Sequence, residues 1–273
     1  MKNFSIIGAG AVGRSIALAL FYNGVKPAGV FSEHGNSASV LAKKIKARLF
    51  GTVEQLQLIS DLIIISVPDD RITDVVACIS AMPQSLRGKT FLHTSGALTS
   101  DILLPLKKKG ASVGSFHPLQ TFVKKKEHTL LKNVYCAIEG DSAANKTSKI
   151  LARKMGARYF TVSKRNKTLY HIAAVFASNY QVTLFSVVEQ IAAIIKIPKA
   201  HVWKIFRPLI EQTLENVFSS SPAEALTGPI ARSDYQTITK HLKALESSKP
   251  LEHLVPLYST LGIETARLAK RKK

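Results

Sequence analysis

Apolar and polar positions change their period partway along the chain. Up to about residue 162, short apolar runs alternate with segments of helical period, a pattern typical of α/β proteins with a parallel sheet. The predicted strands are 3–7, 26–32, 62–67, 90–93, 111–116, 133–138 and 158–162, and the predicted helices between them are 11–22, 37–48 and 70–79. The run LIIISV at 62–67 has no polar alternation, so we expect a strand buried on both faces.

Strand signals stop after about residue 165. The remaining sequence predicts helices at 168–195, 198–218, 234–245 and 253–270. A chain of 273 residues is long enough for two domains with cores of their own. We therefore predict an α/β domain over residues 1–163, followed by an all-α domain over residues 164–273.

The stretch between Lys167 and Glu189 has no charged residue and is long enough to span a bilayer. It contains several polar residues, namely His171, Ser178, Asn179, Gln181 and Thr183. We interpret it as a buried helix with functional polar groups. The apolar N-terminus is not interpreted as a signal peptide, because Arg14 interrupts it.

The chain is strongly basic, with 38 Lys and Arg against 18 Asp and Glu and a formal net charge of +20. Basic runs occur at 107–109, 124–126 and 270–273. No helix-turn-helix, zinc finger or aromatic RNA-binding motif accompanies them, so we interpret the lysines as solvated and expect no nucleic-acid partner. The only cysteines, Cys78 and Cys136, lack metal-ligand spacing and favour a reduced, cytoplasmic setting without a bound metal.

A GxGxxG motif runs from Gly8 to Gly13, between a predicted strand and a predicted helix. In that context Gly8 permits the tight turn, Gly10 lets a pyrophosphate approach the backbone, and Gly13 lets helix and strand pack closely. The phosphates would lie on free N–H groups at the start of the helix, near Ala11 and Val12. The motif predicts a Rossmann dinucleotide-binding domain.

Other cofactor contacts are expected where strands end, because ligands bind at the carboxyl edge of such sheets. Ser32 and Glu33 follow the second strand, and an acid there favours NAD; nearby Lys43 and Lys44 leave NADP open. Further candidates at this edge are Val67, Pro68 and Thr94. Asp69 or Asp70 would cap the following helix.

Candidate catalytic residues follow the later strands and lie in the helical region. His117, in the string GSFHPLQTF, follows the strand 111–116, with Gln120 and Thr121 as neutral donors. Ser95 follows the strand 90–93. In the helical region, His171 and Asn179 are eight residues apart and would face one side of a helix.

The string LTGPIARSD interrupts the predicted helices. Gly228 and Pro229 break the helix, and Ser233 or Asp234 can cap the next one. Arg232 could bind a substrate carboxylate or pair with Asp234.

These strings, in this order, resemble Rossmann-like oxidoreductases with a C-terminal helical domain of unknown function. That family is similar to pyrroline-5-carboxylate reductase, 3-hydroxyisobutyrate dehydrogenase and ketopantoate reductase, and some members are similar to an alternative ketopantoate reductase of pantothenate biosynthesis. Two positions depart from the family pattern: Ser233 replaces a usual Gly, and Glu33 replaces a common Arg. Ketopantoate reductases carry a catalytic Lys eight residues before an Asn, and His171 stands at the corresponding position here.

The resemblance implies NAD(P)H-dependent reduction of a small keto acid. We predict His171 or His117 as the general acid, Asn179 and Ser95 as orienting donors, and Arg232 as the carboxylate anchor. Activity like that of pyrroline-5-carboxylate reductase or a 3-hydroxyacid dehydrogenase, or non-catalytic dinucleotide binding, stays open. A homodimer through the helical domains is expected.

Overall fold

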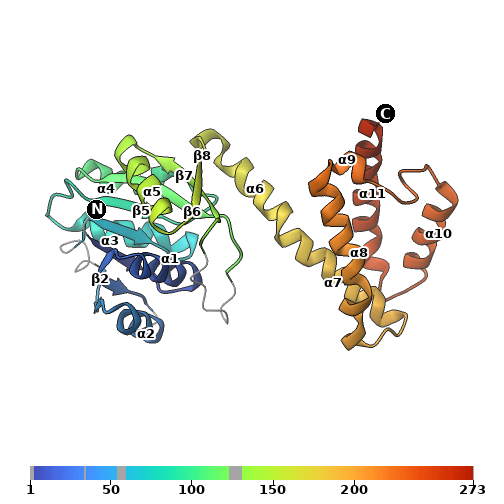
Figure 1. The fold of residues 1–273 in the computed structure, drawn as a ribbon, viewed down its shortest axis with the longest axis horizontal. Coiled ribbons are helices and arrows are strands. Elements are labelled where there is room, and N and C mark those ends of the chain that lie inside the picture. The colour runs from blue at the N-terminus through green and yellow to red at the C-terminus, as the bar shows by residue number, and fades with distance from the viewer. Residues whose placement is uncertain (1–2, 34, 54–59, 123–130, 273) are drawn as a thin grey trace. The chain divides into compact units, whose positions relative to one another are not determined.

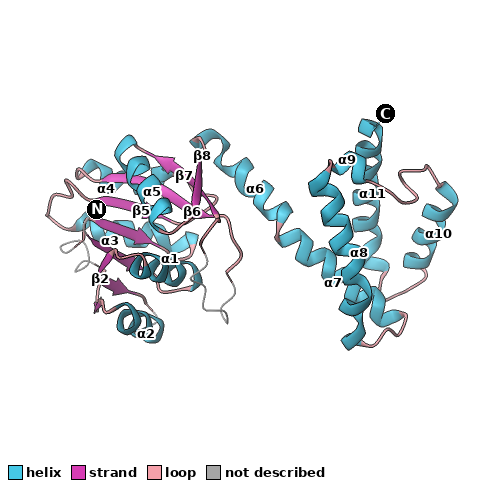
Figure 2. Cartoon of the chain, in the orientation of Figure 1, coloured by secondary structure: helices cyan, strands magenta, loops and turns pink. Residues whose placement is uncertain are grey.

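The computed structural model describes residues 3–33, 35–53, 60–122 and 131–272. The chain divides into two compact units, residues 1–179 and 180–273 (Figure 1). The first unit holds all the strands of the described chain, and the second is built of helices (Figure 2). The basic run at 124–126 lies outside the described residues.

One eight-stranded sheet forms the centre of the first unit. Its strands, in chain order, are β1 (Asn3–Ile7), β2 (Lys26–Phe31), β3 (Arg48–Leu49), β4 (Leu62–Ile65), β5 (Thr90–His93), β6 (Ser112–Pro118), β7 (Tyr135–Gly140) and β8 (Arg158–Thr161). In space they run β3-β2-β1-β4-β5-β6-β7-β8. All neighbouring strands pair in parallel except β6 with β7. The order reverses beside β1, which is where ligands bind in open α/β sheets.

Helices cover both faces of this sheet and create two cores. These helices are α1 (Ala11–Tyr22), α2 (Gly35–Ile45), α3 (Ile72–Ala81), α4 (Leu104–Lys108) and α5 (Ser142–Lys154); α6 (Lys167–Ala177) follows β8. Residues of α1, α2 and α5 share one core with Leu62 and Ile64, whereas residues of α3 and α4 share the other with Ile63 and Ile65. Successive residues of a strand point to opposite faces, so β4 is fully buried as predicted.

Most predicted strands and helices of the first unit are confirmed. The short strand β3 and the helices α4 and α5 were not predicted. The residue range 142–154 has few apolar residues, and Asp141 caps α5 by accepting a hydrogen bond from the Ala144 backbone N–H at 2.9 Å.

The unit boundary lies later in the chain than the sequence indicates. The strand pattern ends near residue 163, but α6 groups with the sheet rather than with the other helices. The reason is tertiary contact: the side chains of Lys167 and Tyr170 on α6 hydrogen-bond to Ser115 and His117 on β6.

The second unit consists of α7 (Asn179–Ile194), α8 (Lys199–Ser219), α9 (Pro222–Ala225), α10 (Tyr235–Glu246) and α11 (Val255–Ala269). Asp234 caps α10 by accepting a hydrogen bond from the Thr237 backbone N–H at 3.0 Å, as predicted. Ser233, where the sequence resemblance leads us to expect Gly, has a positive φ of 58°. That conformation favours glycine.

The prediction of one buried helix over 168–195 is wrong in two respects. The backbone at Ser178 leaves the helical region, with φ −129° and ψ −68°, so that α6 and α7 are separate helices. No Gly or Pro marks the interruption, so the residue pattern could not reveal it. Apart from Lys167 and Ala192, the side chains of both helices are half-buried or exposed.

The same region meets the length and composition expected of a membrane span. Among the described residues, one helical stretch, Lys164–Ile194, does so, with a mean hydropathy of 1.2. Its early residue Lys167 is buried against the sheet, and Ser178 interrupts it. We interpret this stretch as part of the two compact units.

Candidate active site

The glycine turn between β1 and α1 has the geometry that a dinucleotide requires. Gly8 has φ +97°, and a Cβ there would lie 2.3 Å from the Ser66 carbonyl oxygen. A Cβ on Gly13 would lie 2.1 Å from the Gly8 carbonyl oxygen. By contrast, a Cβ on Gly10 would meet no atom within 4 Å, which leaves open space at the start of α1. Gly8 and Gly13 are thus required by the fold, and Gly10 leaves room for a ligand.

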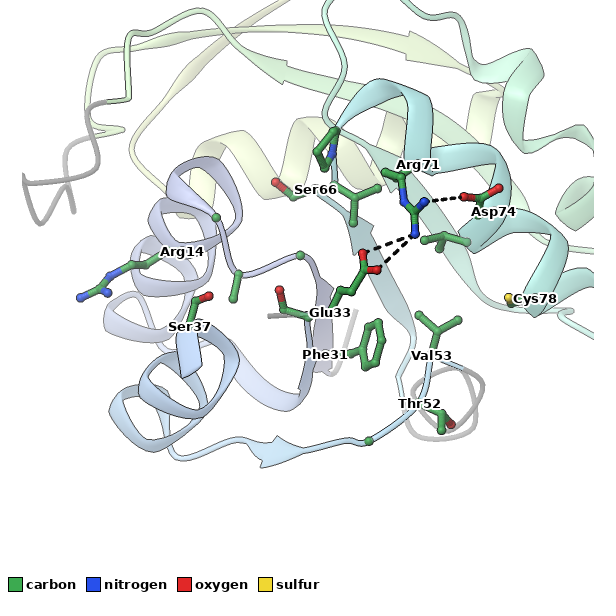
Figure 3. Close-up of a pocket in the computed structure, with 18 of the residues that line it drawn as sticks. Arg14, Phe31, Glu33, Ser37, Thr52, Val53, Ser66, Arg71, Asp74 and Cys78 are labelled. Carbon is green, nitrogen blue, oxygen red and sulfur yellow. Dashed lines mark hydrogen bonds and ion pairs between the residues drawn. The ribbon is translucent and has the colours of Figure 1, made fainter. Parts of the chain in front are cut away.

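A cleft of about 1010 Å³ opens over this turn (Figure 3). Seven of the ten predicted cofactor residues line it: Gly8, Gly10, Ala11, Ser32, Glu33, Val67 and Pro68. Of the other three, Gly13 packs beneath the turn, and the Thr94 Oγ1 lies 3.3 Å from the Ser66 Oγ of the cleft wall. Val12 follows Ala11 in α1 and is half-buried.

Glu33 lies in this cleft and is paired with a cation. The Arg71 guanidinium lies 3.3 Å from the Glu33 carboxylate and 3.4 Å from that of Asp74 (Figure 3). Both members of the Glu33–Arg71 pair are at least half exposed, so the pair itself contributes little stability. The cleft therefore holds a carboxylate suited to ribose hydroxyls and a guanidinium suited to a phosphate.

Ser95 lies at the end of β5, the strand next to β4 in the sheet. Its hydroxyl donates to Asp69 Oδ2 at 2.7 Å and accepts hydrogen bonds from the backbone N–H groups of Ala97 and Leu98. Ser95 thereby holds the turn after β5. Its predicted role as a donor to substrate stays a prediction.

His117 and His171 meet above this turn. An ideal Cβ built on Gly96 would lie 2.7 Å from His171 Nδ1 and 2.9 Å from His117 Nε2. The centroids of the two imidazole rings are 6.1 Å apart. The His171 Nδ1 is buried and makes no hydrogen bond within the described part of the chain. Two imidazoles therefore converge at one point of the same sheet edge as the glycine turn.

Tyr170 orients the first of these rings. Its hydroxyl lies 2.7 Å from His117 Nδ1, and its ring packs edge-on against the imidazole. Burial raises the pKa of Tyr170 to about 12, so the phenol keeps its proton at neutral pH. When that proton is donated to Nδ1, the His117 Nε2 carries the ring proton and presents it on the Gly96 side.

The electrostatics of the site keep His117 neutral. Burial lowers its pKa to about 4, and the neighbouring His171 and Lys167 act in the same direction. At neutral pH, His117 can therefore donate a hydrogen bond from an uncharged ring, while it is a poor source of a free proton. His171, whose buried Nδ1 has no partner among the described residues and lies next to Gly96, is our candidate for proton donor.

A buried lysine was missed by the sequence analysis. Lys167, the first residue of α6, is 1% exposed. Its ammonium group donates to Ser115 Oγ and lies 4.0 Å from Glu139 Oε2. Lysines are almost never fully buried, so no residue pattern marks this one out among the many lysines of a basic chain.

Of the remaining candidates, one begins a separate helix, two lie beyond β6 and one lies in the second unit. Asn179 begins α7 beyond the interruption at Ser178, so the eight-residue spacing from His171 does not place both on one continuous helix. Gln120 and Thr121 are exposed beyond the end of β6. Arg232 is an exposed residue of the second unit. Hydrogen bonds from Thr237 are the main cause of the lowered pKa of Asp234, and the charge of Arg232 lowers it further. The roles predicted for Asn179 and Arg232 stay predictions.

Two sequence families match the chain in succession. Residues 2–118 match the Rossmann-like domain, and residues 134–265 match a domain of unknown function, DUF2520. The chain thus carries a Rossmann-like domain. No curated protein is detectably similar in sequence. These matches agree with the predicted domain types, but they do not confirm the expected relation to ketopantoate reductase or pyrroline-5-carboxylate reductase.

Solved structures share the fold over nearly the whole chain. A candidate NADP oxidoreductase from Bacteroides fragilis is 24% identical, with a TM-score of 0.80 over 97% of this chain and 98% of that one. An imine reductase from Myxococcus stipitatus in complex with NADP⁺ is 18% identical, with a TM-score of 0.70 over 98% and 94% of the two chains. A reductive aminase from Aspergillus terreus, in complex with NADPH and ethyl-5-oxohexanoate, is 17% identical, with a TM-score of 0.68 over all of both chains. At these identities the likeness establishes the fold.

Two buried histidines predict a loss of stability in acid. Burial lowers the pKa of His93 to about 3 and that of His117 to about 4, both below the 6.5 of an unfolded chain. The unfolded state therefore binds more protons, and folding free energy is lost as the pH falls from 6.5 through these values, at about 1.4 kcal/mol per pH unit for each histidine. Thermal unfolding of the wild type and of His93→Gln between pH 7 and 4 would measure it. We expect the variant to lose less; identical slopes would contradict the assignment.

Proposed function

We propose that the protein is an NAD(P)H-dependent oxidoreductase that reduces the carbonyl group of a small keto acid. The observation that carries this proposal is the convergence of His117 and His171 at Gly96. That point lies at the carboxyl ends of β5 and β6, along the same sheet edge as the glycine-lined cleft at β1 and β4. A dinucleotide cleft beside converging proton-bearing groups supports reduction of a polar double bond.

The residues of the cleft fit the cofactor. The amides after Gly10 would hold the pyrophosphate, and Glu33 or Arg71 would contact the adenosine ribose or its phosphate. When bound, the cofactor supplies a hydride. His171 would give the proton that the developing alkoxide needs, and the Nε2–H of His117, held by Tyr170, would donate a hydrogen bond to the same oxygen.

Two substrate classes deserve direct comparison. The sequence resemblance favours keto acids such as ketopantoate, whereas two of the structural neighbours are an imine reductase and a reductive aminase. The test is a screen of NADH and NADPH oxidation with ketopantoate, other small 2-oxo and 3-oxo acids, pyrroline-5-carboxylate and cyclic imines. Turnover of keto acids alone would support the proposal, and turnover of cyclic imines alone would replace the substrate class.

A non-catalytic dinucleotide-binding protein is the alternative from another class. Such a protein needs the glycine turn but no organised imidazoles beside it. Tight binding of NADH or NADPH without turnover on any substrate of the screen would favour this alternative.

Gly10→Ala tests cofactor binding without disturbing the fold. The added Cβ meets no atom within 4 Å, so we expect an unchanged melting temperature. It would occupy the space where the pyrophosphate must approach, and we expect the Kd for NAD(P)H to rise at least about tenfold, equivalent to about 1.4 kcal/mol. Isothermal titration would measure this. Gly35→Ala, which also meets no atom within 4 Å but lies outside the cleft lining, is the matched control. Equal affinities in the two variants would contradict the assigned cofactor site.

We also propose a cytoplasmic homodimer formed through the helical unit. Large apolar side chains are exposed on α7, α8 and α11, including Val182 at 65%, Leu209 at 65%, Phe218 at 79% and Ile263 at 56%. Surfaces of this kind commonly mark interfaces, and two-fold dimers are the commonest oligomers. Light scattering at micromolar concentration should give about twice the 29.8 kDa of one chain. A mass of one chain would exclude the dimer.

A further inference from the structure

The contacts of Lys167 form a buried polar unit beneath the proposed catalytic groups. Its ammonium group donates to Ser115 Oγ and lies 4.0 Å from Glu139 Oε2. The Glu139 carboxylate, 4% exposed, accepts hydrogen bonds from the Ser100 backbone N–H at 2.7 Å and from its hydroxyl at 2.6 Å. The two charges are thus paired and hydrogen-bonded out of contact with water.

Stability alone does not explain such a pair. Desolvating two charges costs several kcal/mol per ion, and well-packed apolar residues of similar volume are often as stable or more stable. The cost is visible in the pKa of Lys167, which burial lowers to about 8, against the opposing attraction of Glu139 and Asp69. A buried ion pair at this position therefore needs another reason.

The reason lies in what α6 presents to β6. Ser115 and His117 are two residues apart on β6 and point to the same face of the sheet. Lys167 and Tyr170 are three residues apart on α6 and lie on one side of the helix, with His171 beside them. The Lys167 ammonium group hydrogen-bonds to Ser115, and the Tyr170 hydroxyl hydrogen-bonds to His117. Together these two contacts set the rotation of α6 about its axis.

We propose that Lys167, with Glu139 as its counter-ion, is a positioning residue of the proposed reductase: its buried ammonium group fixes α6 so that Tyr170 holds His117 and His171 faces Gly96. Lys167 itself is too deeply buried to touch substrate. This inference rests on the proposed function for its catalytic consequence, but the geometry can be tested without any substrate.

The charge of Lys167 has a second effect on the same rings. The titratable groups that face it are Glu139 on β7, Asp69 after β4, His93 at the end of β5 and His117 on β6. Its positive charge lowers the pKa of both histidines, in addition to their burial. Removal of the pair should therefore let His117 accept a proton at a higher pH.

The test is the double variant Lys167→Met/Glu139→Gln, which removes both charges at nearly constant volume. Three properties would be measured on the full-length protein: melting temperature, the NMR titration of the His117 and His171 ring signals, and the kcat and KM of the best substrate. We expect an unchanged or higher melting temperature, a His117 pKa raised by about half a unit or more, a kcat at least about tenfold lower, and an unchanged KM for the cofactor.

The surface pair Lys164–Asp101 provides the matched control. This ion pair joins the turn just before α6 to the segment that follows β5, but each partner is 49% exposed. The variant Lys164→Met/Asp101→Asn should leave the melting temperature, the histidine titrations and kcat close to those of the wild type.

Two results would overturn the proposal. The first is a melting temperature that falls strongly while the histidine titrations and kcat stay unchanged, which would mark the pair as purely structural. The second is a double variant whose histidine titrations, kcat and melting temperature are all the same as those of the wild type.

If the double variant does not fold, Ser115→Ala provides the test, since it removes only the hydroxyl that Lys167 contacts. Unaltered ring signals and an unaltered kcat in that variant would likewise refute the proposal. If the wild type turns over no substrate, the proposed function fails, and the histidine titrations alone decide the role of Lys167.

Discussion

Replacement of His171 by alanine is expected to lower kcat by roughly 10²- to 10⁴-fold, the usual contribution of a general acid. Its Nδ1 is buried, has no hydrogen-bond partner within the described residues, and lies next to Gly96 at the end of β5. A buried polar atom needs a hydrogen-bond partner, and a bound substrate can supply one to this nitrogen. Steady-state kinetics with the best substrate would measure the loss, and the Kd for NAD(P)H should stay unchanged.

His117→Asn is the informative companion. An amide can donate a hydrogen bond but cannot take part in proton transfer, so we expect a smaller loss of kcat than in His171→Ala. His241→Ala is the control. His241 is an exposed histidine of the second unit, and its ring lies next to the Tyr258 hydroxyl. Unchanged turnover in both His171→Ala and His117→Ala would remove the assignment of these residues.

The parts of the fold that the sequence predicts are those with local causes. β4 is apolar at every position, and α1 follows a glycine turn, so both follow from spacing and residue type. The predicted boundary at residue 163 follows the last strand signal, whereas the compact units divide after residue 179, because α6 contacts β6 through Lys167 and Tyr170. The break at Ser178 has no residue-type signal at all.

The same division applies to the candidate site. The glycines, Glu33 and His117 could be predicted as candidates, because each lies at or just beyond the end of a strand and strand ends share one edge of a parallel sheet. Arg71, Tyr170 and Lys167 could not, since their roles come from side chains that meet only after folding. For Lys167 in particular, residue type alone predicts an exposed side chain.

Gly96→Ala is the second substitution with a large expected effect. Gly96 is buried, and its φ is not positive, so alanine brings no backbone strain. The new Cβ would lie 2.7 Å from His171 Nδ1 and 2.9 Å from His117 Nε2, closer than real contacts allow. Since both neighbours are side chains, the rings should move away until their distances from the new Cβ reach the ordinary range above 3.4 Å, while the fold persists. A displacement of about 1 Å at reacting groups can cost roughly 100-fold in rate, and we expect a loss of kcat of that order.

The value of this substitution is that it separates the site from the fold and from the cofactor. The melting temperature should fall by only a few degrees, because one methyl group displaces two movable rings, and the affinity for NAD(P)H should stay unchanged, because Gly96 does not line the glycine cleft. Gly262→Ala in α11 is the matched control, since its Cβ would make only an ordinary contact of 3.7 Å with Ile230. A Gly96→Ala variant with the kcat of the wild type would show that the two histidines can leave Gly96 without consequence, and so would place the chemistry elsewhere in the molecule.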